Sequence, residues 1–272
     1  MEAMRESKRS IPVRAPRFAL DENVPRAWLD GDLEASHVVD ALSLIFPEGE
    51  RFFIRSVKHY LDQVGDDPEL LERVRGFFGQ EGRHGHEHDR MNRILSAQGY
   101  DIERFLGFYR DLAYQRIEHA TPPHLRLAAT VALEHMTSTL AEVAFATEVL
   151  DGAHPRIREM LLWHAVEEIE HRAVAWDVLA RVDPRMSTRA AGFAIGTAML
   201  GLFWTTAYAG FLRDARAMEA VPTKRSRTFH RGLRKAAGMI GRSVVEYFRA
   251  DFHPSEREVD EVAREYVERV GL

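Results

Sequence analysis

Apolar residues recur three or four positions apart along most of the chain, which is the spacing of one face of an α-helix. Long runs in which β-branched residues alternate with polar ones, the pattern of β-strands, are missing from the sequence. We therefore expect an almost wholly α-helical protein. Glycine, proline and aspartate divide the pattern into helical segments at residues 33–64, 68–98, 102–119, 121–150, 155–182, 187–218, 222–249 and 254–270.

Prolines and glycines mark the ends of these segments. Pro68 and Pro155 stand at first-turn positions, where the missing N–H of proline costs little. Gly99 and Gly152 follow the last apolar positions of two segments, as is typical of helix C-termini. Pro47 lies inside the first segment, and we expect it to interrupt that helix.

Two of the segments carry the same spacing of glutamate and histidine. Glu81 precedes His84, and Glu168 precedes His171, so each pair forms the motif Glu-x-x-His. Residues three apart on a helix point to nearly the same side, one turn from each other. Each pair can therefore offer two ligands to one metal ion. One such pair arises often by chance on a solvated helix, whereas two pairs on apolar faces are a stronger signal.

Two further segments each place one glutamate on an otherwise apolar face. Glu50 interrupts a face that includes Phe46 and Phe53, and Glu134 follows Val131 on another. Burying a carboxylate on such a face is costly unless the carboxylate meets a cation. Alone, either glutamate would more often be paired with a basic side chain in the core. Together with the two motifs, they predict a metal site.

One histidine extends this set. His164 lies four residues before Glu168 and therefore faces the same side of its helix, where it could be a seventh ligand. Glu167 and the histidines that flank the motifs are expected outside the ligand set, exposed or hydrogen-bonded to other groups. The candidate metal ligands are Glu50, Glu81, His84, Glu134, His164, Glu168 and His171.

The order of these motifs resembles that of the ferritin-like di-metal carboxylate proteins, in which two helices supply one glutamate each and two supply Glu-x-x-His. The resemblance implies an all-α protein with a ferritin-like four-helix bundle at its core. We expect an N-terminal arm over residues 1–32, of which residues 1–17 are exposed, and the bundle over residues 33–182. Residues 183–272 would add three helices packed on the bundle: an apolar one at 187–218, a basic one at 222–249 and a terminal one at 254–270.

Composition narrows the choice of metal and partner. The chain has no cysteine, so thiolate ligands, disulfides and a catalytic thiol are excluded. Carboxylates with imidazoles suit two iron ions, with manganese as the other candidate, better than zinc, which prefers fewer carboxylates. The formal net charge of −5 provides no global basic surface, and we expect no nucleic-acid partner.

Four stretches of sequence surround the candidate ligands: FPEGERFF at 46–53, GQEGRHGHEHDRMN at 79–92, ALEHMT at 132–137 and WHAVEEIEHRAVAWDV at 163–178. On these stretches the chain resembles a family of bacterial proteins catalogued as predicted metal-dependent hydrolases, from about Pro12 to its end. The motif His-x-x-x-Glu-x-x-His that ends at His171 also resembles the arylamine N-oxygenases, in which an extra histidine binds one iron. That second likeness implies a ligand role for His164 alone. No Gly-x-Ser-x-Gly turn of a serine hydrolase occurs.

This ligand set fits three functions. We favour a non-haem di-iron oxygenase or oxidase that activates O2, takes electrons from a donor and oxidises a small-molecule substrate. The alternative is metal-dependent hydrolysis, in which two ions activate a water that attacks an ester or amide without O2. A third hypothesis, a protein that stores metal or contacts membranes with little turnover, predicts metal loading well above two ions per chain.

An apolar stretch and a basic stretch follow the bundle. Residues 190–212 include no charged side chain and have roughly the length needed to cross a bilayer, and residues 213–242 carry nine Lys or Arg against two acidic residues. The apolar stretch fits a buried helix, an oligomer face or a membrane contact, and the basic one fits anionic lipid and access to a lipid-like substrate. Because residues 1–17 lack the apolar core of a secretory signal, we expect a cytoplasmic protein, and association with the inner face of the membrane is left open as one of these alternatives. We also expect a homodimer.

Glycines recur every third residue beside the first Glu-x-x-His motif, at Gly76, Gly79, Gly82 and Gly85. Each costs roughly 0.5–1 kcal/mol relative to alanine inside a helix, so some other contact must offset them. We favour close packing of another helix over space for a substrate or an O2 channel beside the ligands.

Overall fold

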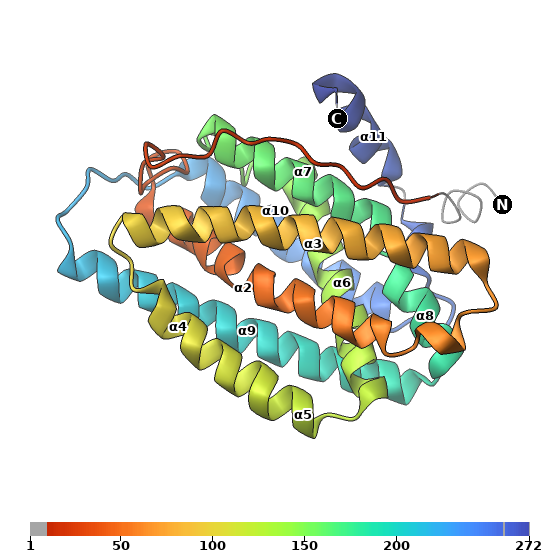
Figure 1. Cartoon of the computed structure of the whole chain (residues 1–272). Coiled ribbons are helices and arrows are strands. Elements are labelled where there is room, and N and C mark those ends of the chain that lie inside the picture. Colours follow the sequence, from red (N-terminus) through yellow and green to blue (C-terminus); the bar gives the residue numbers. More distant parts are fainter. Residues whose placement is uncertain (1–9, 258, 272) are drawn as a thin grey trace.

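Helices make up most of the described chain, residues 10–257 and 259–271 of a computed structural model (Figure 1). They are α2 (Leu33–Lys58), α3 (Pro68–Ala97), α4 (Ile102–Tyr109), α5 (Glu118–Ala120), α6 (Pro123–Ala146), α7 (Pro155–His171), α8 (Val174–Val182), α9 (Met186–Ala217), α10 (Arg227–Tyr247) and α11 (Asp260–Val270). Within the described residues there is no β-strand, only one antiparallel bridge between Leu29 and Ala153. The expected all-α fold is confirmed.

Four of these helices form the centre of the molecule. Helix α2 packs along α3 and α6 packs along α7, and the two pairs meet where α2 contacts α6 and α3 contacts α7 (Figure 1). Their inward faces bury large apolar side chains such as Phe77, Leu127 and Trp163. This arrangement is consistent with a ferritin-like four-helix bundle, since one helix face of each member turns toward a common core.

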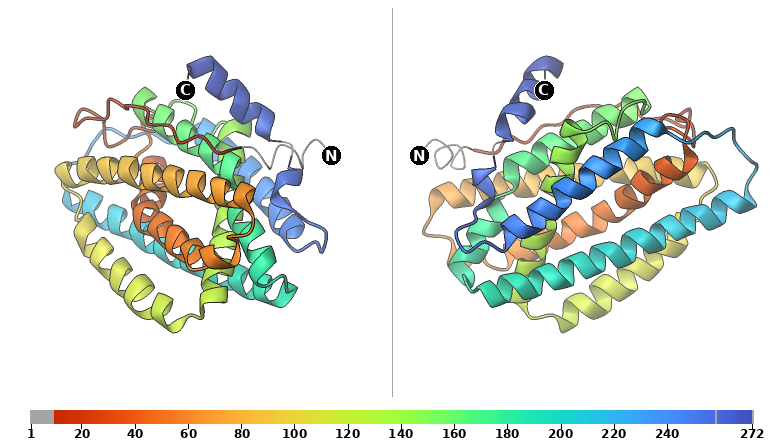
Figure 2. Two further views of the ribbon diagram at one scale, coloured as in Figure 1. Left: turned by 45° about the vertical axis from the view of Figure 1, so that its right-hand side comes forward. Right: turned by 180° about the vertical axis from the view of Figure 1, so that it is seen from behind.

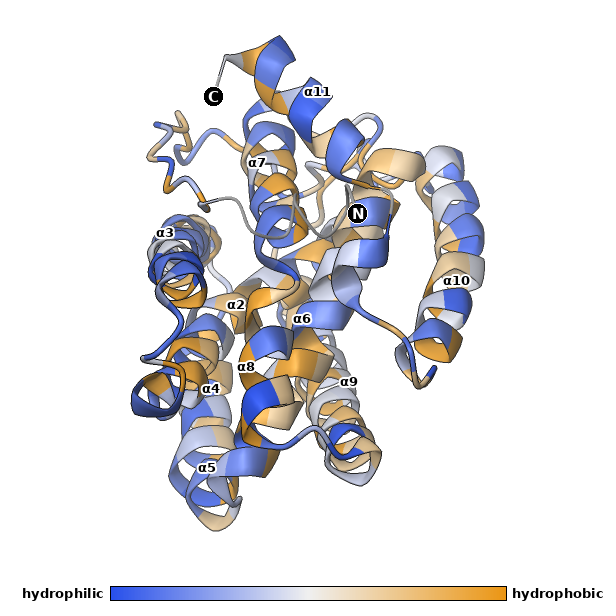
Figure 3. Cartoon of the chain, turned by 90° about the vertical axis from the view of Figure 1, so that its right-hand side faces the viewer, coloured by the Kyte–Doolittle hydropathy of each residue, from blue (hydrophilic) through white to orange (hydrophobic). Residues whose placement is uncertain are grey.

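The C-terminal helices cover the outside of this core. Helix α9 lies across α6 and α2, α10 lies on α6, and α11 lies on α7 (Figure 2). Helix α9 can approach α6 closely because Gly192 has no side chain: a Cβ at that position would overlap the backbone of Ala128. In Figure 3 the residues of α10 alternate between hydrophilic and hydrophobic, as expected of a helix with one face on the core.

Aspartates cap the N-termini of α2 and α3, the two longest helices of the core, and α2 contains a proline without being interrupted by it. The side chains of Asp32 and Asp67 accept hydrogen bonds from backbone N–H groups in the first turns of α2 and α3. Helix α2 continues through Pro47, so the expected interruption is wrong. Pro47 is buried, and the packing of α2 against its neighbours outweighs the one backbone hydrogen bond that proline removes.

Two segments differ from the expected single helices. The segment expected at 155–182 is divided at Arg172 and Ala173 into α7 and α8, and the buried Arg172 guanidinium donates to the carbonyl of Pro254 and to Asp260. Between α4 and α5, Arg110–Ile117 form a π-helix, a rare form that is often found near functional sites.

The N-terminal segment lies against the bundle. Residues 1–9 of the expected exposed arm are outside the described residues, and most of residues 10–17 are exposed, but Ile11 and, just beyond the expected arm, Phe18 are buried. The physical reason is that these apolar side chains find partners on the core. The division of the chain at 32 and 182 into arm, bundle and C-terminal helices stays a prediction, although helices begin at Leu33 and Met186.

Candidate metal centre

All seven expected ligands meet between the four central helices, and none is more than 4% exposed. Helix α2 supplies Glu50, α3 supplies Glu81 and His84, and α6 supplies Glu134. Helix α7 supplies His164, Glu168 and His171. Groups of three whose ligand atoms lie within 4.8 Å of one another are Glu50–Glu81–His84, His84–His164–Glu168, Glu81–Glu168–His171 and Glu50–His88–His164. Glu81 and Glu168 each belong to two of these groups. The cluster therefore contains neighbouring candidate metal positions that have a carboxylate in common.

The distances in the cluster fit ions placed between the side chains. His171 Nε2 lies 3.3 Å from an oxygen of Glu81 and 3.3 Å from an oxygen of Glu134. His164 Nε2 lies 2.9 Å from Glu168 Oε1 and 3.8 Å from Glu50 Oε1. Two ligand atoms at about 2.1 Å from one ion, on adjacent corners of an octahedron, are about 3 Å apart.

The atoms that face this space have no other use. Among the described residues, both carboxylate oxygens of Glu50, Glu81 and Glu134 are buried without a hydrogen-bond partner, and so are His84 Nδ1 and His171 Nε2. Leaving a buried polar atom unpaired costs about 1–3 kcal/mol, and more for a charged one. A cluster of this kind in the centre of a protein is best explained by cations that the side chains are arranged to bind.

The opposite nitrogens of these two histidines are paired. His84 Nε2 donates to Glu167 Oε2 over 3.0 Å, and His171 Nδ1 donates to Gln80 Oε1 over 3.0 Å. Donation from one ring nitrogen leaves a lone pair on the other, so both rings present the tautomer that a metal ligand needs. The sequence did not identify either acceptor, and Glu167, expected outside the ligand set, is one of them.

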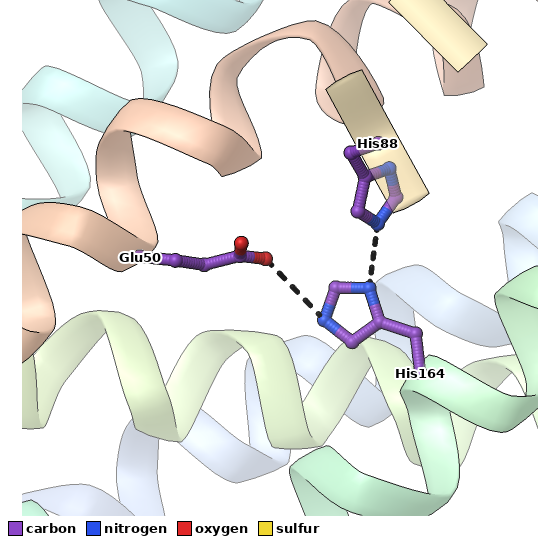
Figure 4. Close-up of side chains that lie close together, drawn as sticks. All are labelled: Glu50, His88 and His164. Atoms are coloured by element: carbon purple, nitrogen blue, oxygen red, sulfur yellow. Dashed lines mark hydrogen bonds and ion pairs between the residues drawn. The ribbon is translucent and has the colours of Figure 1, made fainter. Parts of the chain in front are cut away.

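His164 is held in the same way by a chain of hydrogen bonds (Figure 4). His164 Nδ1 lies 2.7 Å from His88 Nε2, and His88 Nδ1 lies 2.7 Å from the hydroxyl of Ser43, which donates to Met91 Sδ. If the Ser43 hydroxyl donates to sulfur, it accepts from His88 Nδ1, and His88 Nε2 must then accept from His164 Nδ1. The lone pair of His164 Nε2 is thereby turned toward Glu50 and Glu168.

The charges in the cluster are unbalanced without metal. Burial raises the pKa of Glu50 and Glu81, and the neighbouring carboxylates raise both further. Burial also raises the pKa of Glu134 to about 8. Burial opposes protonation of His171, but the charges of Glu134 and Glu168 outweigh it and raise the pKa of His171 to about 9. The metal-free cluster therefore holds protons where cations would neutralise the carboxylates.

The N-terminal segment covers the outer partners of the ligands. Gln80, which accepts from His171, donates its amide to the carbonyl of Pro12 over 2.9 Å. Arg14 makes two hydrogen bonds of 2.7 Å with Glu170 and approaches Glu167 at 3.4 Å. The segment thus holds side chains that in turn hold two of the candidate ligands.

The glycine repeat is explained in part by this segment. A Cβ at Gly76 would lie 2.6 Å from atoms of Ile11, and a Cβ at Gly79 would overlap the side chain of Val13. Gly85 faces Glu50, with 3.1 Å between its hypothetical Cβ and Glu50 Oε2, whereas Gly82 has nothing within 4 Å. Close packing accounts for the first two glycines, but the partner is the non-helical N-terminal segment and not the expected helix. Room for a candidate ligand accounts for Gly85.

Replacing Arg14 by alanine is expected to weaken metal binding by about 10- to 100-fold, the usual cost of losing a group that orients a ligand. The change removes the cation that pairs with Glu167 and Glu170 and so loosens His84 and the Gln80 amide. Competition with a chelator measures the affinity. Arg17→Ala, an exposed arginine of the same segment, is the matched control. Equal affinities for both variants would contradict the role given to Arg14.

Two apolar cavities border the cluster. One, of about 190 Å³, lies between α9 and α10 over α6 and α7 and reaches His164 and Glu168; we call it the α9–α10 cavity. The other, of about 100 Å³, lies between α2, α6, α9 and the π-helix and reaches Glu50; we call it the π-helix cavity. Phe46 and Thr137 line both.

Some residues around the metal centre were not predicted from the sequence. His88 and Gln80 lie four and one residues from members of the first Glu-x-x-His motif, so helical spacing could have placed His88 on the ligand face. Gln80 and Arg14 carry no such signal, because their role depends on the path of the N-terminal segment.

Comparison with known proteins identifies the family of the chain. A family model described as "Predicted metal-dependent hydrolase" matches residues 12–258. No curated protein and no solved structure matches the chain. The family description names hydrolysis, so the favoured expectation of a di-iron oxygenase or oxidase that activates O2 is wrong. The ligand pattern misled because both chemistries use divalent ions held by carboxylates and imidazoles. The chain belongs to the family of predicted metal-dependent hydrolases, as its motifs indicated.

Proposed function

We propose that this protein is a hydrolase that uses two divalent metal ions to cleave an ester or amide bond. The observation that carries the proposal is that carboxylate oxygens and imidazole nitrogens without hydrogen-bond partners converge on one buried space. The opposite ring nitrogens of His84 and His171 are already hydrogen-bonded, so these two rings are oriented for binding a metal. Such an arrangement is costly unless cations occupy it. The match of the chain to a family described as hydrolytic supports the choice of reaction.

Each ion would have its own end of the cluster. Glu50, His84 and His164 lie at one end and Glu134 and His171 at the other, with the two shared carboxylates, Glu81 and Glu168, between them. Four carboxylates offset two divalent charges, so the occupied site would be neutral. Carboxylate oxygens with imidazole nitrogens favour iron or manganese.

Bound divalent ions would supply Lewis acidity, which makes water nucleophilic near neutral pH and polarises a carbonyl group. The chain's own residues set the conditions for this. Phe46 lies 4.8 Å, between ring centroids, from both His164 and His88, and Phe77 packs edge-on against His171. These rings and the apolar cavities keep bulk water from the ligands, and a low dielectric strengthens every charge interaction there.

The reaction can be tested with isotopic water. Metal-loaded protein would be incubated under argon with acyl esters and amides in water enriched in ¹⁸O. Hydrolysis places one solvent oxygen in the carboxylic acid product. Turnover that begins only when air is admitted, or products without solvent oxygen, would overturn the proposal.

We also propose that the protein sits on an anionic membrane surface through α9 and α10. Helix α9 is the one described helix that is long and apolar enough to cross a membrane, and only 22% of its most apolar window is buried. Since its inner face packs on α6 and α2, surface contact fits better than a span. Arg225, Arg227, Arg234 and Arg242 on and before α10 are exposed. Helices α9 and α10 lie on the same side of the molecule (Figure 2). Homodimer formation stays a prediction.

Sedimentation with vesicles tests the membrane contact. Vesicles with anionic phosphatidylglycerol should bind the protein more tightly than phosphatidylcholine vesicles do. The double substitution R234S/R242S should weaken binding by roughly 5-fold per arginine. The matched control is R75S/R93S, which removes two exposed arginines from α3. An equal loss of vesicle affinity in both double variants would show a general effect of charge and would contradict the assignment of the membrane contact to α10.

A further inference from the structure

The α9–α10 cavity has a polar inner end and apolar walls. His164, Glu168 and Thr137 are its polar lining residues, and all lie where the cavity meets the metal ligands. The rest of its wall is aliphatic or aromatic and comes from α2, α6, α7, α9, α10 and the connection between α6 and α7. A ligand that fills the cavity must therefore be apolar along its length and polar at the end beside Glu168.

The polar groups along the wall are already satisfied. Trp204 Nε1 donates to the carbonyl of Val38 over 2.8 Å, and the Thr137 hydroxyl donates to the carbonyl of Glu134 over 3.2 Å. Neither group offers a hydrogen bond to a polar ligand, because each has given its proton to the backbone. A sugar, nucleotide or peptide would lose its hydration here without compensation.

The cavity leads outward between two helices. Leu233 of α10 lines it and is 40% exposed, so the wall continues to the surface. Figure 2 shows α9 and α10 on the same side of the molecule, apart from each other and both in front of α6. This opening lies on the apolar and basic face formed by α9 and α10.

The π-helix cavity has a different character. It is also mainly apolar, but Glu118 and Arg126 line it in addition to Glu50, so its charged groups are not confined to the ligand cluster. An unbranched hydrocarbon chain is favoured in a passage with a single polar end. The α9–α10 cavity fits that description and the π-helix cavity does not.

We propose that the α9–α10 cavity binds the acyl chain of the substrate, with the scissile carbonyl beside Glu168 and the chain directed toward Leu233. This rests on the proposed function, because it places the reacting carbonyl at the metal centre. Water adds to the carbonyl carbon, the bond from that carbon to the ester oxygen or amide nitrogen breaks, and the leaving group takes a proton. The products are a fatty acid and an alcohol or amine.

Binding of a fatty-acid series tests the cavity without turnover. Calorimetric titration of the metal-loaded protein with acetate, hexanoate, octanoate and decanoate separates carboxylate binding, common to all, from chain binding. Affinity should rise by up to about 4-fold for each added methylene. An affinity that does not change with chain length would overturn the proposal.

Two pairs of variants locate the chain. Ala144→Trp fills the α9–α10 cavity and should flatten the rise in affinity, whereas Ala113→Trp fills the π-helix cavity and should not. Leu233→Glu at the mouth should lower decanoate affinity but not acetate affinity. Its control, Leu202→Glu, changes an equally exposed leucine of α9 that lines neither cavity. The opposite result in either pair would overturn the assignment.

The outcome also separates this inference from the proposed function. Chain-dependent binding with no hydrolysis of any acyl ester would refute the hydrolase and leave the chain site standing. Hydrolysis of short acetyl esters with no dependence of binding on chain length would support the hydrolase and refute the chain site. Metal content and thermal midpoint, measured for every variant, show that each protein is folded and loaded.

Discussion

Replacing Glu168 by glutamine should reduce hydrolysis by more than about 100-fold and lower the bound metal from two ions per chain. Loss of a group that merely orients a ligand costs about 10- to 100-fold, and loss of a shared ligand must cost more. Glu168 belongs to the groups at both ends of the cluster. Its neutral amide would leave the cations short of one negative charge. Metal analysis and initial rates on an acyl ester measure the two effects.

A partly buried glutamate outside the cluster provides the control for this substitution. Glu142 lies on α6, outside the cluster, and its carboxylate pairs with Arg257 at 2.9 Å. Glu142→Gln should change stability but leave metal content and the rate per bound metal unchanged. If Glu168→Gln keeps two ions and normal activity, Glu168 does not hold the metal.

Metal-free protein should lose stability as the pH rises from 6.5 to 9, and added metal should remove that loss. The pKa of Glu134 in the folded protein is about 8, above its ordinary 4.5, and that of His171 is about 9, above 6.5. A group whose pKa is raised by folding stabilises the fold below its unfolded pKa, and this is lost as the pH passes the folded pKa. The expected loss is on the order of 2 kcal/mol, or roughly 4–8 °C in Tm for a chain of this size.

Two buried histidines, His84 and His88, have the opposite effect on stability, but they do not titrate between pH 6.5 and 9. Burial lowers the pKa of His84 and His88, so they favour the fold as the pH rises, but only up to their unfolded value near 6.5. Above that value they are neutral in both states and contribute no slope. Bound cations keep the carboxylates ionised and His171 unprotonated, so stability of the loaded protein should not fall with pH.

Thermal unfolding at several pH values measures this slope with and without a chelator. Glu134→Gln removes one of the two groups and should flatten the slope of the metal-free protein, whereas the control Glu142→Gln should flatten it less, since burial raises the pKa of Glu142 only to about 7. A metal-free protein whose Tm rises between pH 6.5 and 9 would contradict the charge balance described for the cluster.

Helical spacing was sufficient to predict which side chains would meet between the four central helices. Glu81 with His84, and Glu168 with His171, share a helix face by periodicity alone, and Glu50 is visible as the charged member of an apolar stripe. The structure brings these side chains together because four apolar faces must bury one another, and any polar residue on those faces goes with them. The ligand assignment itself awaits metal analysis.

Other features of the site depend on contacts between distant segments, which local periodicity does not contain. Arg14 reaches Glu170 across 156 positions, and Gln80 reaches His171 across 91. The division between α7 and α8 depends on Arg172, whose partners lie near the C-terminus. The choice between oxidation and hydrolysis was beyond the motifs as well, because the same ligands serve both reactions.

Titration of metal-free protein with Mn²⁺ under argon, while the acid released from an acyl ester is followed, tests the central claim most directly. We predict that the rate rises with added metal and stops rising at two ions per chain. Activity that needs O2, an inactive protein at two ions per chain, or loading well above two ions without turnover would each contradict a dinuclear hydrolytic centre.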